Sequence, residues 1–275
     1  MAREAAAAAG HGARSRVQPS GWREARGNEG TGVITSTRNP RLEEVRRLRR
    51  SRDRRASGLF LAEGVRDVER ALAAGLTVRE SFVAPALLPD WPHLHTAVSE
   101  RVLTSLAYRA GPEGIVAVVE IPHRVLPQNV TLVVVAVGIE KPGNLGAIAR
   151  SADAAGADAL LVADAISDPW NPNAIRASTG AVFTLPIQET TLDDLLALPL
   201  RKIATVVDAP TPYTAADLTP PSALIVGSED TGLDERWRAA ADVQVSIPMR
   251  GRTVDSLNAS TAAAILLYET LRQRG

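Results

Sequence analysis

The sequence predicts an α/β protein with two units: a small α/β unit in front and, behind it, a mostly parallel sheet covered by helices on both faces. From residue 130 onward, short apolar segments alternate with helical patterns, which is typical of such a sheet. The first of these segments, TLVVVAVGI, is apolar without interruption, as in a strand buried on both faces. Pro122 and Pro127 precede it and indicate a linker. The predicted divisions are a disordered tail (1–32), a front unit (33–122), a linker (123–129) and a sheet unit (130–275).

Composition excludes several classes of protein. At 275 residues the chain can bury two cores of ordinary size. It contains no cysteine, which rules out disulfides, thiolate metal sites and a cysteine nucleophile. No apolar run approaches the ~20 residues that cross a bilayer, and the alanine-rich start lacks the apolar core of a signal peptide. We expect a cytoplasmic protein that needs neither a metal nor a membrane.

The net charge of zero conceals an uneven distribution. Residues 1–125 hold 20 arginines and 14 acidic residues, whereas 126–275 hold 11 basic and 17 acidic residues. This asymmetry suggests that only the front half meets a polyanion. The alternative is that exposed helices simply carry charge, and charge alone does not decide between the two.

In the front unit, the segment 41–55 places Leu42, Val45 and Leu48 on one helical face, and Gly58 ends this predicted helix. Arginines cover the rest of its surface, and the candidate polyanion contacts are Arg46, Arg47, Arg49 and Arg50. The remaining predicted elements are a strand at 59–61, a helix on Val65, Val68 and Leu72 that Gly75 ends, a strand at 81–84, a helix at 99–106 and a strand at 115–121.

In the sheet unit, the predicted elements are strands at 131–139, 159–163, 203–207, 223–226 and 243–247, and helices at 148–155, 173–178 and 259–272. Three loops with chemically useful side chains each follow one of these strands. Because open α/β sheets bind ligands at the carboxyl ends of their strands, these loops are the candidate site.

The first loop, 140–150, begins like a nucleotide-binding turn, but its glycines do not have the G-x-G-x-x-G spacing. A dinucleotide-binding dehydrogenase is therefore disfavoured. Asn144 is expected at the entrance of a helix and Arg150 one to two turns further on. Taken alone, these two residues are explained as a helix cap and a surface charge.

The second loop is GSEDTG at 227–232, whose two glycines let a ligand approach the backbone closely. The third runs from Ile247-Pro248-Met249 to Ser256-Leu257-Asn258-Ala259-Ser260. Each loop alone could be an ordinary turn or helix start. Their occurrence together, in this order and after strands, is what indicates a site.

This combination resembles the SpoU/TrmH family of RNA 2′-O-ribose methyltransferases, which belong to the SPOUT class. The motif N-x-G-x-x-x-R matches Asn144, Gly146 and Arg150; G-x-E-x-x-G matches Gly227, Glu229 and Gly232; and the third motif matches the two segments of the last loop. The front unit, with Arg38-Asn39-Pro40 and FLAEG at 60–64, is similar to the L30e-like RNA-binding domain of many members.

The resemblance implies a trefoil knot, a homodimer with active sites at the subunit interface, and S-adenosylmethionine as methyl donor. The implied catalytic residues are Arg150, Asn144, Glu229, Ser256 and Asn258. The implied donor-binding residues are Val206, Gly227, Ser228, Glu229, Ile247, Leu257 and Asn258. Arg176 lies where family members contact RNA or the partner subunit, with a helix end as the alternative explanation, and it joins Arg46, Arg47, Arg49 and Arg50 as a candidate RNA contact.

An L30e-like front unit favours 23S ribosomal RNA over transfer RNA as substrate. With its arginine-rich composition, the chain is also similar to the enzymes that methylate ribosomes in antibiotic producers, such as those for thiostrepton or avilamycin. A housekeeping rRNA or tRNA methyltransferase shares every motif and remains open. The rival from another class is a non-catalytic RNA-binding protein of ribosome assembly, which would be expected to have lost Arg150 or Asn258.

Overall fold

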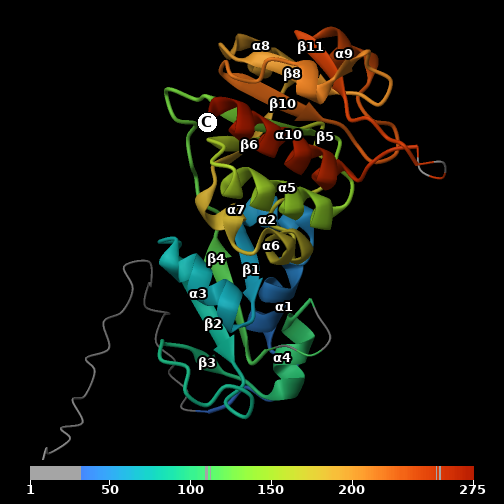
Figure 1. Ribbon diagram of the computed structural model, residues 1–275. Helices are drawn as coiled ribbons and strands as arrows, with labels where there is room; N and C mark the ends of the chain where they lie inside the picture. Colours follow the sequence, from blue (N-terminus) through green and yellow to red (C-terminus); the bar gives the residue numbers. More distant parts are fainter. Residues whose placement is uncertain (1–31, 109–110, 112, 252, 254) are drawn as a thin grey trace, which may run out of the picture.

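The computed structural model describes residues 32–108, 111, 113–251, 253 and 255–275. The predicted tail, apart from Gly32, lies outside the described residues. The described chain contains two sheets at opposite ends of an elongated molecule, a four-stranded one near the front and a seven-stranded one behind it (Figure 1). The predicted α/β class is confirmed. None of the helices in this part of the chain combines the length and apolar character needed to cross a membrane.

The front sheet has the strand order β1-β4-β2-β3. β4 pairs antiparallel with β1 and β2, while β3 adds a short parallel edge to β2. Helices α1 and α4 pack on one face of this sheet. The elements of the front unit are α1 Pro40–Arg47, α2 Ser51–Ser57, β1 Leu59–Glu63, α3 Val65–Ala73, β2 Val78–Val83, β3 Thr96–Ala97, α4 Glu100–Leu106 and β4 Ile115–Glu120.

The prediction of one helix over 41–55 is wrong, because the structure has two. α1 ends at Arg47, and Arg50 has an extended backbone (φ −95°, ψ 133°) before α2 begins. Leu48 is the last apolar residue of the predicted stripe, so the residues of the predicted helix after Leu48 have no apolar side chain in its stripe to pack against the same core. The predicted end at Gly58 is confirmed, with φ at +67°.

The large sheet has the order β7-β6-β5-β10-β8-β11-β9, and each pairing within it is parallel. The predicted strands are present, whereas β7, β9 and helices α7 to α9 were not predicted. The elements are β5 Leu132–Val137, α5 Pro142–Ala154, β6 Ala159–Ala163, α6 Pro172–Ser178, α7 Ala181–Thr184, β7 Ile187–Thr190, α8 Leu192–Ala197, β8 Arg201–Thr205, β9 Thr211–Pro212, a 3₁₀ turn η1 Tyr213–Ala215, β10 Ser222–Val226, α9 Glu235–Ala239, β11 Val243–Ser246 and α10 Ala259–Arg274. The trefoil knot stays a prediction.

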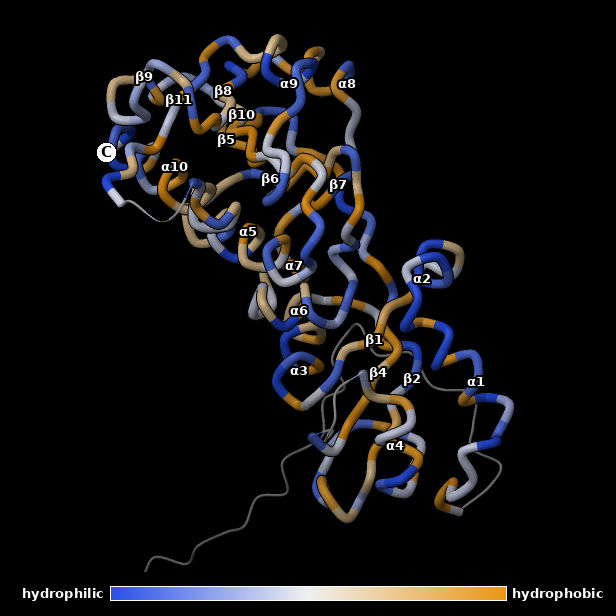
Figure 2. The backbone as a smooth tube through the Cα atoms, turned by 90° about the vertical axis from the view of Figure 1, so that its right-hand side faces the viewer, coloured by the Kyte–Doolittle hydropathy of each residue, from blue (hydrophilic) through white to orange (hydrophobic). Residues whose placement is uncertain are grey.

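Alternate residues of β5 point to two different cores, as predicted for a strand buried on both faces. Leu132, Val134 and Ala136 belong to the cluster that includes α5 and α10. The residues between them belong to a second cluster that includes Leu195 of α8 and Trp237 of α9. Figure 2 shows the apolar strands β5 and β10 between these layers. The sheet therefore has helices on both faces.

One apolar cluster crosses from the front unit to the sheet unit. Phe60 in β1 lies 5.0 Å, between ring centroids, from Trp170 in the loop after β6 and 5.8 Å from Phe183 in α7. The same cluster contains residues of α3, α5 and α10. The two units are thus packed together and not merely tethered by the residues between β4 and β5.

Candidate active site

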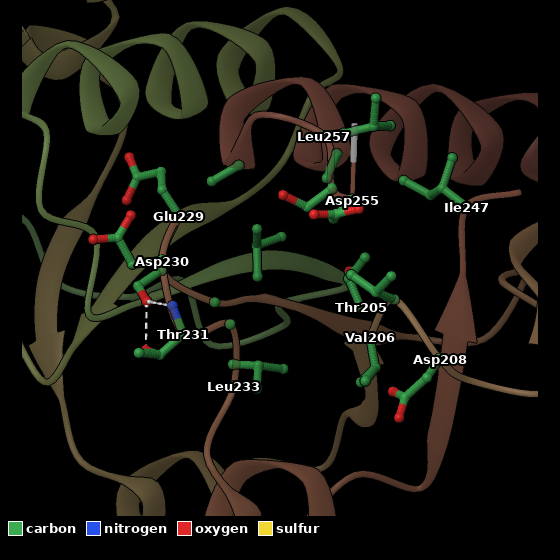
Figure 3. A pocket seen from close by; sticks show the side chains of 18 of the residues that line it. Thr205, Val206, Asp208, Glu229, Asp230, Thr231, Leu233, Ile247, Asp255 and Leu257 are labelled. Atoms are coloured by element: carbon green, nitrogen blue, oxygen red, sulfur yellow. Dashed lines mark hydrogen bonds between the residues drawn. The ribbon is translucent and has the colours of Figure 1, made fainter. Parts of the chain in front are cut away.

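The three motif loops meet at one edge of the large sheet. They follow β5, β10 and β11, and β10 pairs with β5 while β8 lies between β10 and β11. A cavity of about 410 Å³ opens at this edge. Its lining comes from the ends of β8 and β10, from the loop after β11 and from the start of α10 (Figure 3).

Part of the cavity wall is apolar. The side chains of Val206, Leu233, Ile247 and Leu257 contribute to it and come from three different loops. This surface suits the flat apolar faces of an aromatic base.

The tight turn after β10 requires glycine at 227. A Cβ on Gly227 would lie 2.3 Å from the carbonyl carbon of Gly232 and 2.6 Å from the amide nitrogen of Leu233. Ser228 and Gly232 exchange two backbone hydrogen bonds, of 3.2 and 3.1 Å, which close the turn. The glycine therefore allows the two arms of the loop to touch and leaves backbone at the cavity wall.

Acidic side chains dominate the polar part of the lining. Glu229, Asp230, Asp208 and Asp255 line the cavity, and Arg238 pairs with Asp208 at 2.8 Å. Among the described lining residues, four carboxylates stand against one guanidinium, which is an excess of negative charge. Such a cavity favours a ligand that carries positive charge.

A chain of hydrogen bonds joins the three motifs beside this cavity. Nδ2 of Asn144 donates to Oε1 of Glu229 in a short hydrogen bond, and Nδ2 of Asn258 donates to Oδ1 of Asn144 at 3.1 Å. Asn258 in turn accepts from the amide and hydroxyl of Ser260, at 2.9 and 2.6 Å, and so caps α10. The other oxygen of Glu229 accepts from the backbone N–H of Glu140 at 3.4 Å.

Two expectations about the first loop need correction. Helix α5 begins at Pro142 and not near Ile148, and Lys141 is its N-cap. Asn144 therefore lies within the first turn and does not cap the helix. Because a proline at the first helical position needs no N–H partner, the helix can start early, which leaves the Asn144 side chain free to reach Glu229.

Gly146, the middle residue of the same motif, has a packing role. A Cβ there would lie 2.1 Å from the carbonyl oxygen of Ala174, so only glycine lets α5 pack this closely against α6.

The structure gathers most of the predicted site residues. Those that line the cavity are Val206, Gly227, Ser228, Glu229, Ile247, Ser256 and Leu257. Asn144 and Asn258 join the cavity through Glu229. Arg150 and Arg176 are exposed on α5 and α6, and neither is among the described residues that line it. Arg150 comes six residues after Asn144, about 240° further around the helix axis.

The four front arginines differ from one another in their surroundings. Arg46 donates to the carbonyl of Thr37 and to Oγ of Ser105, at 2.6 and 3.0 Å. Arg49 donates to carbonyls at the C-terminus of α4, at 2.9 Å for Ser105 and 3.3 Å for Leu106. Arg46 and Arg49 thus stabilise the front unit itself.

Arg47 and Arg50 are exposed instead. They remain candidates for binding a polyanion.

Sequence reasoning missed several residues at or near the site. Asp208 and Asp255 line the cavity, and their positions just after β8 and just before the second segment of the third motif were the only signals. Arg54 and Asp168 form a buried ion pair at 2.6 Å between the two units. In the sequence, nothing distinguishes Arg54 from the other arginines around it.

The described residues include no group of three or more histidine, aspartate or glutamate side chains arranged to hold a metal ion.

Comparison with known families gives two matches that together cover most of the described chain. Residues 131–268 match the SpoU rRNA Methylase family, and residues 39–117 match an MRM3-like substrate binding domain. The chain is 35% identical over 266 residues to a 23S rRNA (uridine(2479)-2′-O)-methyltransferase of Streptomyces viridochromogenes, covering 88% of this chain and 92% of that protein.

Solved structures are similar over the same length. One is a crystal structure of an RNA 2′-O ribose methyltransferase, with a TM-score of 0.76 and 44% identity over 88% of this chain and 99% of the other. Another is the SpoU methyltransferase AviRb from Streptomyces viridochromogenes in complex with the cofactor AdoMet, with a TM-score of 0.78 and 33% identity over 86% and 98% of the two chains.

Proposed function

The chain belongs to the SpoU rRNA methylase family, and we propose that it transfers a methyl group from S-adenosylmethionine to a ribose 2′-hydroxyl of RNA, with 23S ribosomal RNA as the substrate. One observation carries the proposal for this chain. The hydrogen-bond chain Glu229–Asn144–Asn258 joins all three motifs at the mouth of a donor-sized cavity.

The cavity fits the donor in both shape and charge. Its apolar residues Val206, Ile247 and Leu257 would hold the adenine, and the backbone at Gly227 and Ser228 would hold the polar parts. The excess of carboxylates favours the cationic sulfonium and ammonium groups of S-adenosylmethionine. Direct attack of the hydroxyl oxygen on the sulfonium methyl carbon needs no metal: the oxygen–carbon bond forms as the sulfur–carbon bond breaks, S-adenosylhomocysteine leaves as a neutral thioether, and the proton of the hydroxyl passes to water.

The acceptor chemistry requires a group that stabilises the forming alkoxide, because a ribose hydroxyl is a poor nucleophile. We assign this role to Arg150, because a guanidinium carries positive charge and offers a planar set of donors. Asn144, Glu229, Ser256 and Asn258 would orient the ribose by hydrogen bonds.

A homodimer would bring Arg150 to a site. Because Arg150 is exposed and is not among the described residues that line the cavity of its own chain, we propose that it serves the cavity of a second copy. Helix α10, which packs beside α5, presents Tyr268 and Leu271 with 52% and 45% of their surfaces exposed. Covering these apolar side chains would favour the association.

The two units would divide the work. Residues 33–122 would dock the RNA through phosphate contacts from Arg47 and Arg50, and residues 130–275 would carry out methyl transfer. Arg176 would add a contact near the site. Ribosomal RNA as a substrate implies that the protein acts in the cytoplasm.

The test is methyl transfer from labelled S-adenosylmethionine to 23S rRNA, with 16S rRNA and transfer RNA as parallel substrates. We expect one 2′-O-methylated ribose in 23S rRNA. RNA binding without donor binding would instead favour an assembly protein, and a labelled transfer RNA would favour a tRNA enzyme. Growth of a host expressing the chain on avilamycin and thiostrepton separates a resistance role from a housekeeping one.

A further inference from the structure

Arg54 and Asp168 form an ion pair that joins the two units and is almost fully shielded from water. Arg54 lies in α2 and Asp168 in the loop after β6, and their side chains are 1% and 7% exposed. Nε of Arg54 donates to Oδ2 of Asp168 at 2.8 Å, and Nη2 lies 2.6 Å from the same oxygen in the ion pair. Nη1 donates to the carbonyl of Leu48, and the second carboxylate oxygen accepts from the N–H of Trp170. Hydrogen bonds therefore fix the orientation of both side chains of the pair.

Stability alone does not explain such a pair. Removing two charges from water costs free energy that their mutual attraction roughly offsets, and apolar pairs of similar size are often as stable or more so. Phe60, Trp170 and Phe183 already hold the two units together by apolar contact. What the ion pair adds is direction, because hydrogen bonds fix an angle and a register that stacked rings do not.

The loop that carries Asp168 also contacts the candidate active site. Two hydrogen bonds hold its neighbour Ser167 in place. The N–H of Ser167 donates to the carbonyl of Ile139 at 3.2 Å, and its hydroxyl donates to the carbonyl of Glu140. The N–H of Glu140 then donates to Glu229 at 3.4 Å. Glu229 is the residue that receives the hydrogen bond of Asn144.

We propose that Arg54 and Asp168 are positioning residues for methyl transfer, which fix the RNA-docking unit relative to the Glu229–Asn144–Asn258 network through Ser167 and Glu140. The proposal rests on the proposed function. It implies that the pair determines which ribose of a docked RNA reaches the methyl group. Apart from Glu229, the described residues that line the donor cavity take no part in this chain of contacts, so donor binding should change little when the pair is replaced.

The test replaces both charges by apolar side chains, as Arg54→Met with Asp168→Leu, so that neither charge is left buried and alone. We expect this variant to keep its thermal stability and its affinity for S-adenosylhomocysteine. Its single-turnover rate on 23S rRNA should fall by about 10- to 100-fold, the size of effect that a misplacement of about 1 Å can produce. Methylation should also spread to neighbouring riboses. Arg54→Lys alone, with Asp168 kept, should have a rate between those of the Met/Leu variant and the wild type, because an ammonium cannot reproduce the planar set of donors of a guanidinium.

A matched control exists in the next residue. Arg55 pairs with Glu189 across the same two units at 2.8 Å, but these side chains are 52% and 65% exposed. Arg55→Ala with Glu189→Ala should leave both the rate and the methylated position unchanged, because exposed ion pairs contribute little.

Hydrogen exchange of backbone amides makes the proposal testable without activity. In the Met/Leu variant, amides at 138–145 should exchange faster than in the wild type, and in the Arg55/Glu189 control they should not. A wild type that methylates no RNA would count against the proposed function alone. If the Met/Leu variant keeps the normal rate, the single site and the normal exchange at 138–145, the pair has no positioning role.

Discussion

Asn258 donates a hydrogen bond of 3.1 Å to Asn144, although 114 residues separate them in the sequence. The charge of Glu229 fixes the direction of this bond. An ionised carboxylate only accepts, so Asn144 must turn its NH₂ group toward Glu229 and its oxygen toward Asn258. Asn258 must then donate to Asn144 and present its own oxygen to Ser260. One carboxylate thereby orients two amides.

This dependence predicts that the aspartate variant at position 144 is worse than the alanine variant. Asn144→Ala removes two hydrogen bonds and should lower single-turnover methyl transfer moderately. Asn144→Asp puts a second carboxylate beside Glu229, which repels it and offers no donor, and should lower the rate further. Equal rates for the two variants would show that the direction of the hydrogen bonds does not matter.

Arg150→Ala should lower turnover by roughly two to three orders of magnitude, the range for loss of one preorganised donor. Because Arg150 does not line the cavity of its own chain, the affinity for S-adenosylhomocysteine should stay unchanged. Arg150→Lys should recover little. Calorimetry and single-turnover kinetics on an rRNA fragment measure the two effects separately, and a rate lost only through weaker donor binding would remove Arg150 from the proposed role.

Gly227→Ala should abolish donor binding, since its Cβ would overlap backbone atoms of Gly232 that cannot move without opening the turn. Gly143→Ala is the control, because its Cβ would meet no atom within 4 Å and alanine favours the helix. Binding of S-adenosylhomocysteine distinguishes the two variants. A Gly227→Ala protein that binds normally would mean that the turn does not shape the cavity.

Arg47→Glu with Arg50→Glu should weaken RNA binding and reduce its dependence on salt concentration, because each lost phosphate contact lowers the number of counterions released. Arg46→Ala and Arg49→Ala should instead lower the melting temperature of the protein, because these side chains bond to α4 and to the segment before α1. Filter binding over a salt series and thermal melts provide the comparison. An unchanged RNA affinity in the first variant would show that Arg47 and Arg50 are exposed to solvent without binding RNA.

Acid should remove a specific contribution of Glu269 to stability. Two hydrogen bonds from Arg272, at 2.9 and 2.7 Å, are the main cause that lowers the pKa of Glu269 from 4.5 to about 2, with a further bond from Gln273. A lowered pKa stabilises the fold above pH 4.5, and this contribution disappears as the pH falls from 4.5 toward 2.

Glu269→Gln should therefore be less stable than the wild type near neutral pH, with the difference shrinking below pH 4.5. Denaturant unfolding at several pH values measures it, with exposed Glu44→Gln as the control. A difference that does not change with pH would contradict this account.

The large sheet and the strands of the site could be predicted because their information is local. Uninterrupted apolar runs such as 132–137 indicate strands buried on both faces, and the order of the motifs places their loops at one edge. The break between α1 and α2 was not predicted: the apolar stripe ends at Leu48, but a polar helix could continue beyond it, and only the structure shows the extended backbone of Arg50. The same is true of the start of α5, which a proline permits but does not require.

The residues of the site were predictable in kind but not in arrangement. Glu229 and Leu257 line the cavity as the motifs suggested, whereas Arg150 lies outside it. Helical periodicity places Arg150 and Asn144 on different faces of α5, but only the structure shows that Asn144 is the one bonded to Glu229, which lines the cavity. Long-range pairs such as Arg54 with Asp168 depend on how two units dock, which no local pattern encodes.

The parallel pairing of β5 with β10 also determines when the large sheet can fold during synthesis of the chain. β5 is complete at residue 137, but the neighbour that closes its other side ends only at residue 226. Contacts between segments so distant in sequence form slowly, and not before both have left the ribosome. The turn at Gly227, the cap at Asn258 and the cavity between them come later still. The part of the chain that would methylate ribosomal RNA thus leaves the ribosome after the unit that would dock that RNA.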